Sequence, residues 1–340
     1  MTDNDPISTS PHEGTPDPDE RRAADRPAEA IVRPGRRPAG KSFFELFPHL
    51  FLIPLLLVTI GVLVYLFFVA IAKDTRDARQ ILSDIATGGE HARKQDAYAL
   101  AAYLRSKEAA GEPIQRFSRE DVSLIVSLLE KYPEDQFLRK YLVLALGRAG
   151  QPADSLPVLK GLIEKPEISD EERASLVQAL GLTHSEEAIP ILLSQVRSLT
   201  GDDRWELRLY SLAALMEIWQ NRTDLPVRDV IAAELRRHVG DPRAEISWHS
   251  AFWLATRFAD PAGIETLEQL SDAEFLDRHR GDRGYPLEEA DKEKWMLRAV
   301  EGLYSVDRER LVERLPELRD RAREKRWATV LNKVNQLLEE

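Results

Sequence analysis

The sequence contains no cysteine. This absence excludes a disulfide framework, catalysis by a thiolate and any zinc or iron–sulfur site held by cysteine. The seven histidines are scattered, no two of them have the spacing of metal ligands, and no HExxH sequence occurs. Glycine-rich phosphate-binding loops are missing as well, and residue order suggests no Ser/His/Asp set. We therefore expect no metal, no cofactor and no catalysis.

Basic residues are outnumbered: 47 Lys and Arg stand against 58 Asp and Glu, giving a formal net charge of −11. Nucleic-acid binding depends on basic surfaces that neutralise phosphates, so this balance argues against nucleic acid as a partner. With 340 residues, of which 43% are hydrophobic, the chain is long enough to bury a sizeable core.

Residues 1–41 have the composition of a disordered tail. The segment 1–40 contains seven prolines and no aromatic residue, so it buries too little apolar area to offset its conformational entropy. Basic residues gather at the end of the tail, at Arg33, Arg36, Arg37 and Lys41. They fit a topology signal beside a membrane span, or a docking tail for a cytoplasmic partner or anionic lipid head groups.

One long hydrophobic run, residues 46–72, contains no Asp, Glu, Lys or Arg. As a helix, its part Leu50–Ala72 is about 34 Å long, against about 30 Å of hydrocarbon in a bilayer. We therefore expect a transmembrane helix that contacts lipid there. Ala70-Ile71-Ala72 also matches the cleavage pattern of a signal peptide. Because the run is far longer than the apolar region of a signal peptide, an uncleaved signal anchor is favoured.

The basic residues that flank this run indicate its orientation. Four Lys or Arg lie in residues 27–46, and three lie in residues 73–92. This small excess predicts that the N-terminus is cytoplasmic and that residues 73–340 lie outside the cytoplasm, in the periplasm if the protein is bacterial.

Residues 73–340 show the apolar periodicity of helices and no alternating run that would form a strand. Val122, Ile125, Val126 and Leu129, for example, follow the spacing i, i+3, i+4, i+7. We predict an all-α fold, with juxtamembrane helices (about 74–86 and 91–109) in residues 73–112. The helix pairs predicted beyond them are 119–131 with 135–148, 153–165 with 170–183, 186–199 with 202–220, 226–239 with 243–258, 261–270 with 287–304, and 307–322 with 327–339.

Three short sequences have the form of a capping box, in which a serine and an acidic residue three positions later bond each other's backbone at a helix start. Each is predicted to begin a helix. They are Ser118 with Asp121, Ser169 with Glu172, and Ser271 with Glu274.

Segments of the predicted helix pairs repeat along the chain. Residues 142–159 (LVLALGRAGQPADSLPVL) align with residues 176–192 (LVQALGLTHSEEAIPIL), and Gly147 matches Gly181 at an offset of 34. Residues 251–267 give a weaker copy. The quality of the first two copies indicates a repeat architecture.

These residues resemble the HEAT repeat, in particular the short bacterial type found in phycobilin-lyase relatives. The resemblance implies that residues 113–340 form an armadillo-like α-solenoid of HEAT-like antiparallel helix pairs, whose second helices line a concave side where partners bind. A TPR array has the same period, and an irregular helical bundle is a further alternative. The HEAT-like array is favoured because Gly147 and Gly181 come just before turn residues, at the end of a second helix.

Tryptophan supplies two candidate partner-binding residues, Trp205 and Trp248, both on predicted second helices. Most tryptophans in the C-terminal half of the chain are expected to pack between repeats. Trp248 and Trp253 are five positions apart and cannot face the same way, so one of them is expected to be exposed. An exposed tryptophan on the concave side would serve as an anchor for a partner.

Residues 271–286 interrupt the repeat pattern as an irregular insertion with a basic cluster. A long loop of this kind is often functional, so the cluster is a candidate binding site for an acidic partner or an anionic ligand. In the alternative, the insertion is merely tolerated and its arginines pair locally with Asp277 and Asp282. The candidate residues are Arg278, His279, Arg280, Arg283 and Tyr285.

Together these features predict a single-pass, membrane-anchored HEAT-repeat scaffold or adaptor that is not an enzyme. Tethering raises its effective concentration for other membrane components, so we expect an accessory subunit of a membrane complex that binds protein partners. The alternatives are a TPR-like interaction module and a HEAT-like lyase or chromophore-handling accessory protein. The last is implied by the phycobilin-lyase resemblance.

Overall fold

The computed structural model describes residues 55–56, 58–63, 76–199, 204–224, 226–281, 284 and 286–339. The chain divides into two compact units, Met1–Asp74 and Thr75–Glu340. The expected tail and most of the expected transmembrane helix lie outside the described residues. In the first unit, residues 55–56 and 58–63 are helical. No helix among the described residues is both long enough and apolar enough to span a bilayer.

Helices make up the described secondary structure of Thr75–Glu340, which confirms the predicted all-α fold. Among these residues, the pairing between Arg280 and Pro286 is an isolated bridge and not part of a strand. In chain order the helices are α3 (Ala78–Thr87), α4 (Glu90–Ala109), α5 (Arg119–Lys131), α6 (Gln136–Ala149), α7 (Pro152–Ile163), α8 (Asp170–Leu182), α9 (Ala188–Ser198), α10 (Trp205–Asn221), α11 (Arg228–His238), α12 (Ala244–Trp253), a π-helical turn (Leu254–Phe258), a 3-10 turn (Pro261–Gly263), α13 (Ile264–Leu270), α14 (Ala273–Arg278), α15 (Glu289–Val306), α16 (Arg308–Lys325) and α17 (Ala328–Glu339).

The predicted helix pairs are present as α5 with α6, α7 with α8, α9 with α10, α11 with α12, α13 with α15, and α16 with α17, and in each pair the two helices contact each other. Their ends match the predicted ones to within about three residues when the π-helical and 3-10 turns are counted. The insertion differs from the prediction, because residues 273–278 form α14 instead of an irregular loop.

Two of the three predicted capping boxes start helices as expected. The Ser118 hydroxyl accepts a bond from the Asp121 amide at α5, and Ser169 accepts one from Glu172 at α8. The third prediction is wrong. Ser271 ends α13, where its hydroxyl donates to the Glu268 carbonyl at 2.8 Å, and Asp272 caps α14 in its place. A carboxylate one position later satisfies the first free amides of this short helix.

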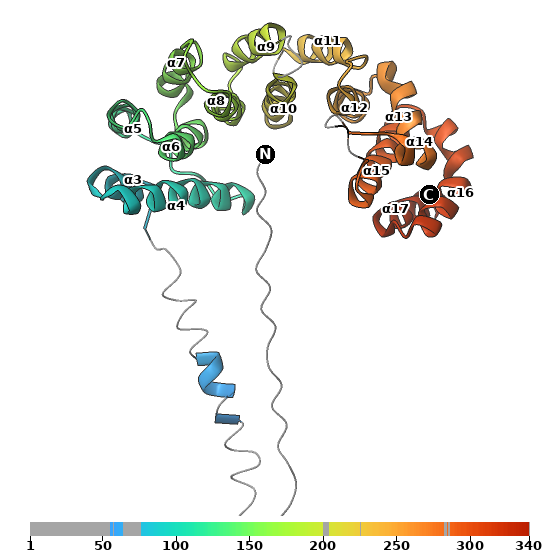
Figure 1. Cartoon of the computed structure of the whole chain (residues 1–340), viewed down its shortest axis with the longest axis horizontal. Helices are drawn as coiled ribbons and strands as arrows, with labels where there is room; N and C mark the ends of the chain where they lie inside the picture. The colour runs from blue at the N-terminus through green and yellow to red at the C-terminus, as the bar shows by residue number, and fades with distance from the viewer. Residues whose placement is uncertain are drawn as a thin grey trace, which may run out of the picture. The chain divides into compact units, whose positions relative to one another are not determined.

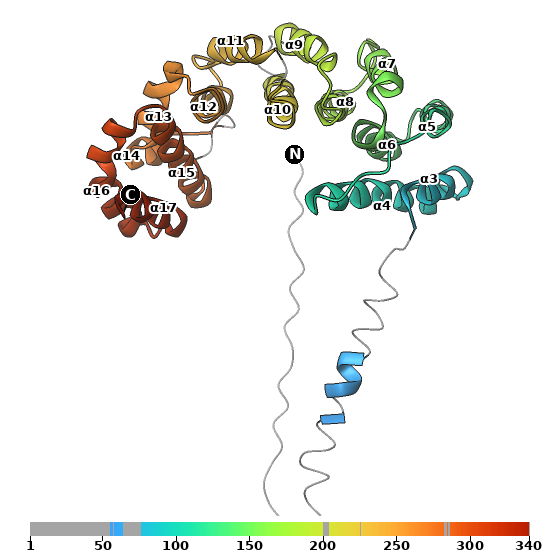
Figure 2. The same cartoon turned by 180° about the vertical axis from the view of Figure 1, so that it is seen from behind.

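Within Thr75–Glu340 the helices form a curved row of two layers (Figure 1). Helices α6, α8, α10, α12 and α15 form the inner layer, and α5, α7, α9 and α11 form the outer one, as the opposite view also shows (Figure 2). Each inner helix contacts the next along the row. Helices α3 and α4, expected as separate juxtamembrane helices, pack on α5 and α6 and share their hydrophobic core.

Glycine allows the inner helices α6 and α8 to approach closely. A Cβ atom on Gly147 would lie 2.4 Å from the carbonyl oxygen of Ala179, and one on Gly181 would lie 2.9 Å from the Cβ of Ala214. Both glycines lie within their helices, since α6 continues to Ala149 and α8 to Leu182. The repeated Leu-Gly sequence therefore serves packing between successive inner helices instead of helix termination.

Arginines at matching positions of α6 and α8 join these two inner helices to the outer helices before them. The guanidinium of Arg139 donates to the Leu129 carbonyl at the end of α5 at 2.7 Å, and that of Arg173 donates to the Ile163 carbonyl at the end of α7 at 3.2 Å. These bonds satisfy carbonyls that the ends of the outer helices leave free. Arg139 also forms a salt bridge with Glu172 of α8, which links one pair to the next.

The close approach at Gly147 predicts opposite effects of two glycine substitutions. Gly147→Ala places a methyl group against the backbone of α8 and is expected to lower the free energy of unfolding by about 1–3 kcal/mol. At Gly161 in α7, an added methyl group would meet no atom within 4 Å. Gly161→Ala is therefore expected to raise the free energy of unfolding by up to about 1 kcal/mol, because alanine favours the helix. Thermal and urea denaturation of both variants tests this, and equal effects would contradict the proposed contact.

Candidate functional site

The inner layer carries a groove of about 770 Å³ that we call the inner-face groove. It runs across α6, α8 and α10, and Glu108 of α4 also lines it. Its lining consists of Glu108, Lys140, Arg148, Asp170, Glu171, Ala174, Ser175, Gln178, Leu182, Arg204, Glu206, Leu207, Tyr210, Ala213, Ala214 and Glu217.

The groove repeats the same helix face in successive repeats. Glu171, Gln178 and Leu182 of α8 have counterparts in the next repeat on α10, at Glu206, Ala213 and Glu217. Positions separated by three, four or seven residues lie on one side of a helix. The opposite side of each helix packs into the core, and the groove lies at the edge of that core, where buried residues such as Ser175, Leu182 and Ala214 also line it.

Carboxylates outnumber basic side chains in the inner-face groove. Its five carboxylates and three basic groups leave an excess of two negative charges. Arg148 pairs with Glu108 at 3.0 Å and Arg204 with Asp170 at 3.6 Å. A hydrogen bond from His184 lowers the pKa of Glu217, so this carboxylate stays ionised at neutral pH. The groove therefore favours a ligand with positive charge.

An aromatic patch adjoins the groove. Tyr98 of α4 is 51% exposed and Phe137 of α6 is 44% exposed, and both rings contact Tyr141 edge to face, at centroid distances of 5.5 and 4.7 Å. Lys140 lines the groove, and its Nζ atom lies 5.9 Å from the centroid of the Tyr141 ring. Within the groove Tyr210 is 47% exposed. Exposed tyrosines beside a groove are typical anchors for a protein partner.

The structure does not support Trp248 as an exposed anchor. Its ring is only 4% exposed and packs against Phe275, His279 and Trp295. Burial follows because α14 of the insertion covers this face of α12. Trp205 is partly buried against the hydrophobic core at the start of α10, and it is not part of the groove lining.

Two arginines of the insertion, Arg278 and Arg280, bond within it. The Arg278 guanidinium donates to the Glu274 carbonyl at 3.2 Å, and that of Arg280 donates to the Gly284 carbonyl at 3.3 Å. The His279 ring lies 4.6 Å from that of Trp248. Arg283 and Tyr285 lie outside the described residues.

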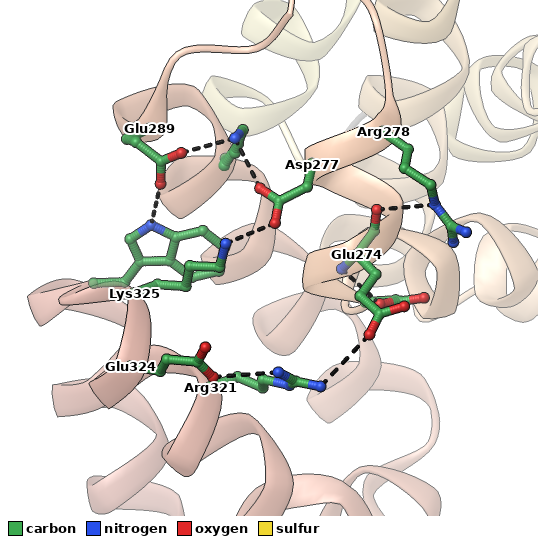
Figure 3. Close-up of polar contacts among 10 residues, drawn as sticks. Glu274, Asp277, Arg278, Glu289, Arg321, Glu324 and Lys325 are labelled. Carbon is green, nitrogen blue, oxygen red and sulfur yellow. Dashed lines mark hydrogen bonds and ion pairs between the residues drawn. The ribbon is translucent and has the colours of Figure 1, made fainter.

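Asp277 joins the insertion to the last helices instead of pairing with the neighbouring arginines. It accepts bonds from Lys292 of α15 at 2.8 Å and from Lys325 of α16 at 2.6 Å (Figure 3). Lys292 also donates to Glu289, which accepts a bond from the Trp327 indole (Figure 3). The pKa of Asp277 is lowered most by the bond from Lys292 and next by the bond from Lys325. These contacts give α14 a structural role.

The sequence predicts partners on the side lined by the second helices, but its candidate residues, Trp205, Trp248 and those of the insertion, are not among those that line the inner-face groove. The signal for this groove was present in the exposed face of two predicted second helices, where Glu171, Gln178, Tyr210 and Glu217 recur at helical spacing. Such polar residues are common on any solvated helix. Only the packing of α6, α8 and α10 side by side turns their exposed faces into a groove.

No family model matches the chain, and neither a curated protein nor a solved structure matches it. Among the residues that the structure describes, no three His, Asp or Glu side chains come together as a metal site.

The Asp277 contacts predict acid sensitivity of α14. The pKa of Asp277 lies below its ordinary value of 3.8, so its stabilising contribution is present above that value and is lost as the pH falls through the lowered pKa. Asp277→Asn is expected to lower the protection of the α14 amides against hydrogen exchange, relative to their intrinsic rates, at neutral pH and to reduce the further loss of protection below pH ~4. Glu313→Gln, on the exposed side of α16, is the control and should leave this exchange unchanged. Identical exchange in wild type and Asp277→Asn would show that the contacts do not hold α14.

Proposed function

We propose that the protein is a membrane-anchored, HEAT-like scaffold that binds a protein partner along the inner layer and carries out no catalysis. The inner-face groove, with the aromatic patch beside it, is the observation that carries this proposal. Small-molecule sites are lined mainly by apolar and aromatic groups. This groove is lined mainly by charged and small side chains, which suits a polypeptide better.

The HEAT-like solenoid is supported by three features of Thr75–Glu340. Successive inner helices contact one another, as repeats that stack in series do. Gly147 and Gly181 make equivalent close approaches to the next inner helix. Arg139 and Arg173 make equivalent bonds to the preceding outer helix. The recurrence of these contacts at matching positions of successive helix pairs favours a repeat array over an irregular bundle.

The partner segment is expected to carry Lys or Arg side chains together with an apolar side chain. The positive charges would complement the carboxylate excess of the groove. The apolar side chain would contact the exposed rings of Tyr98 and Phe137, where burial of apolar area gives affinity.

Anchoring through residues 46–72 belongs to the same proposal. The length of this run, together with its lack of Asp, Glu, Lys and Arg, supports a single span. The flanking Lys and Arg support a cytoplasmic N-terminus and a scaffold on the other side, which is the periplasm in a bacterium. There the tether would concentrate the inner-face groove near other membrane components.

Site-specific photo-cross-linking in cells tests the partner-binding role. A photoreactive residue in place of Gln178, in the groove, is expected to capture a specific partner, because this side chain lines the proposed contact surface. Lys160, an exposed residue of the outer helix α7, provides the matched control position and should capture none. Adding Glu171→Lys, which reverses one charge of the groove, is expected to reduce capture at position 178 at least about threefold. Equal capture at positions 178 and 160 would contradict the proposal.

A reporter fused after Glu340 tests the orientation. Alkaline phosphatase folds only where disulfides form, so we expect an active fusion if Thr75–Glu340 is periplasmic. A fluorescent reporter that requires the cytoplasm should be dark at the same position. The reverse pair of results would place the scaffold in the cytoplasm and overturn the proposed orientation.

A further inference from the structure

A basic cluster without a carboxylate partner among the described residues lies between α12 and α15. Its central residue is Arg298, a half-buried arginine of α15 whose guanidinium carbon lies 4.8 Å from the ring centroid of Trp295 and 5.4 Å from that of Phe252. The guanidinium also meets Nε2 of His249 on α12, at 3.5 Å. Lys294 lies one helical turn before Arg298 on α15 and is exposed. We call these residues the Arg298 cluster.

In the structure as described, Arg298 lacks the carboxylate partner that three other arginines near the core of this unit have. Arg139 pairs with Glu172, Arg148 with Glu108, and Arg208 with Asp241. Within the described part of the chain, no carboxylate lies within ion-pair distance of Arg298 or Lys294. The rings of Trp295 and Phe252 offset part of the cost of taking this cation out of water, and a carboxylate ligand would offset more of it.

The histidine beside Arg298 supplies no negative charge. Burial, together with the positive charges of Arg298 and Lys294, lowers the pKa of His249 to about 3, so its ring is neutral at physiological pH. Its Nδ1 atom is buried and has no hydrogen-bond partner among the described residues. Burial likewise lowers the pKa of Arg298, whose charge is nevertheless retained at neutral pH. Beyond the one neutral acceptor at His249 Nε2, the cluster offers donors and positive charge, and a ligand must bring the negative charge.

The charge balance selects the kind of acceptor. Glu301 lies one turn after Arg298, and its negative charge favours the charged form of Arg298. Lys294, Arg298 and Glu301 together leave one excess positive charge. One excess charge suits a carboxylate, whereas a phosphate dianion would meet repulsion from Glu301. The planar guanidinium also matches a carboxylate through two parallel hydrogen bonds.

We propose that Arg298, assisted by Lys294, binds a carboxylate of a protein partner, either an Asp or Glu side chain or a C-terminal carboxylate. The site lies on inner-layer helices α12 and α15, in the same layer as the inner-face groove. The assignment of this ligand to a protein partner rests on the proposed scaffold function. The partner would then present basic residues to α8 and α10 and an acidic residue to α15.

A direct binding measurement tests the site. The full-length chain in non-ionic detergent is titrated against fluorescein-labelled hexaglutamate, with fluorescein-labelled hexaserine as the reference, at a constant ionic strength of about 0.15 M. Arg298→Met keeps the contact with Trp295 but removes the charge, and is expected to weaken hexaglutamate binding at least about tenfold. Arg298→Lys, which keeps the charge but loses the fork of donors, should weaken it less. Arg105→Met changes the same charge on an exposed face of α4 and should bind as wild type does.

The thermal stability of Arg298→Met separates binding from a structural role. Because the substitution removes an unpaired, partly desolvated charge, the melting temperature is expected to stay the same or rise. A clear fall would identify Arg298 as a structural residue and overturn the proposal. Equal binding of hexaglutamate and hexaserine by wild type, or equal binding by wild type and Arg298→Met, would also overturn it.

Competition and cross-linking identify which proposal fails if one does. Inorganic phosphate that displaces hexaglutamate better than acetate does, at equal ionic strength, would overturn the assignment to a carboxylate. Normal hexaglutamate binding without partner capture at Gln178 would remove the proposed scaffold function and leave the carboxylate site. Normal capture without hexaglutamate binding would remove the carboxylate site alone.

Discussion

No helix pair in Thr75–Glu340 buries its apolar face alone, and the contact between successive inner helices is the interaction on which the rest depends. At Gly147 the α6 backbone meets the α8 backbone, with no room for a methyl group between them. The first hydrophobic core consequently runs without a break from α3 to α12, and the second continues to α17. This packing leaves part of one face of α6, α8 and α10 exposed, and that face carries the inner-face groove.

Arginine serves two purposes along the same row of helices. Arg139 and Arg173 satisfy carbonyls at the ends of outer helices and hold each pair together. Arg298 has aromatic neighbours and a neutral histidine but no acidic partner among the described residues. The surroundings decide the difference, because a guanidinium paired with carbonyls or carboxylates stabilises the fold, whereas we propose that Arg298, which has no carboxylate partner in the described structure, binds one from a ligand.

Charge is distributed unevenly over the inner layer. The groove over α6, α8 and α10 has an excess of carboxylates, while α15 presents Lys294 and Arg298. A partner segment that lies along the layer with basic and acidic residues in the matching order would be favoured, and the reverse order would meet like charges. The insertion, which the sequence presented as the basic binding region, is held to α15 and α16 through Asp277. It therefore contributes to the end of the row and buries Trp248.

The sequence by itself determined the helices and their order. Apolar residues at helical spacing, prolines between helices and serine caps such as Ser118 act locally, so they can be recognised without tertiary contacts. The tertiary structure decided what could not be recognised in this way. The packing role of Gly147 and the burial of Trp248 each depend on a helix that is distant in sequence. The cap at Asp272 depends on competition between neighbouring residues that can cap the same helix. The groove and the Arg298 cluster arise for the same reason, since each is formed by side chains of separate helices that meet only when the repeats pack side by side.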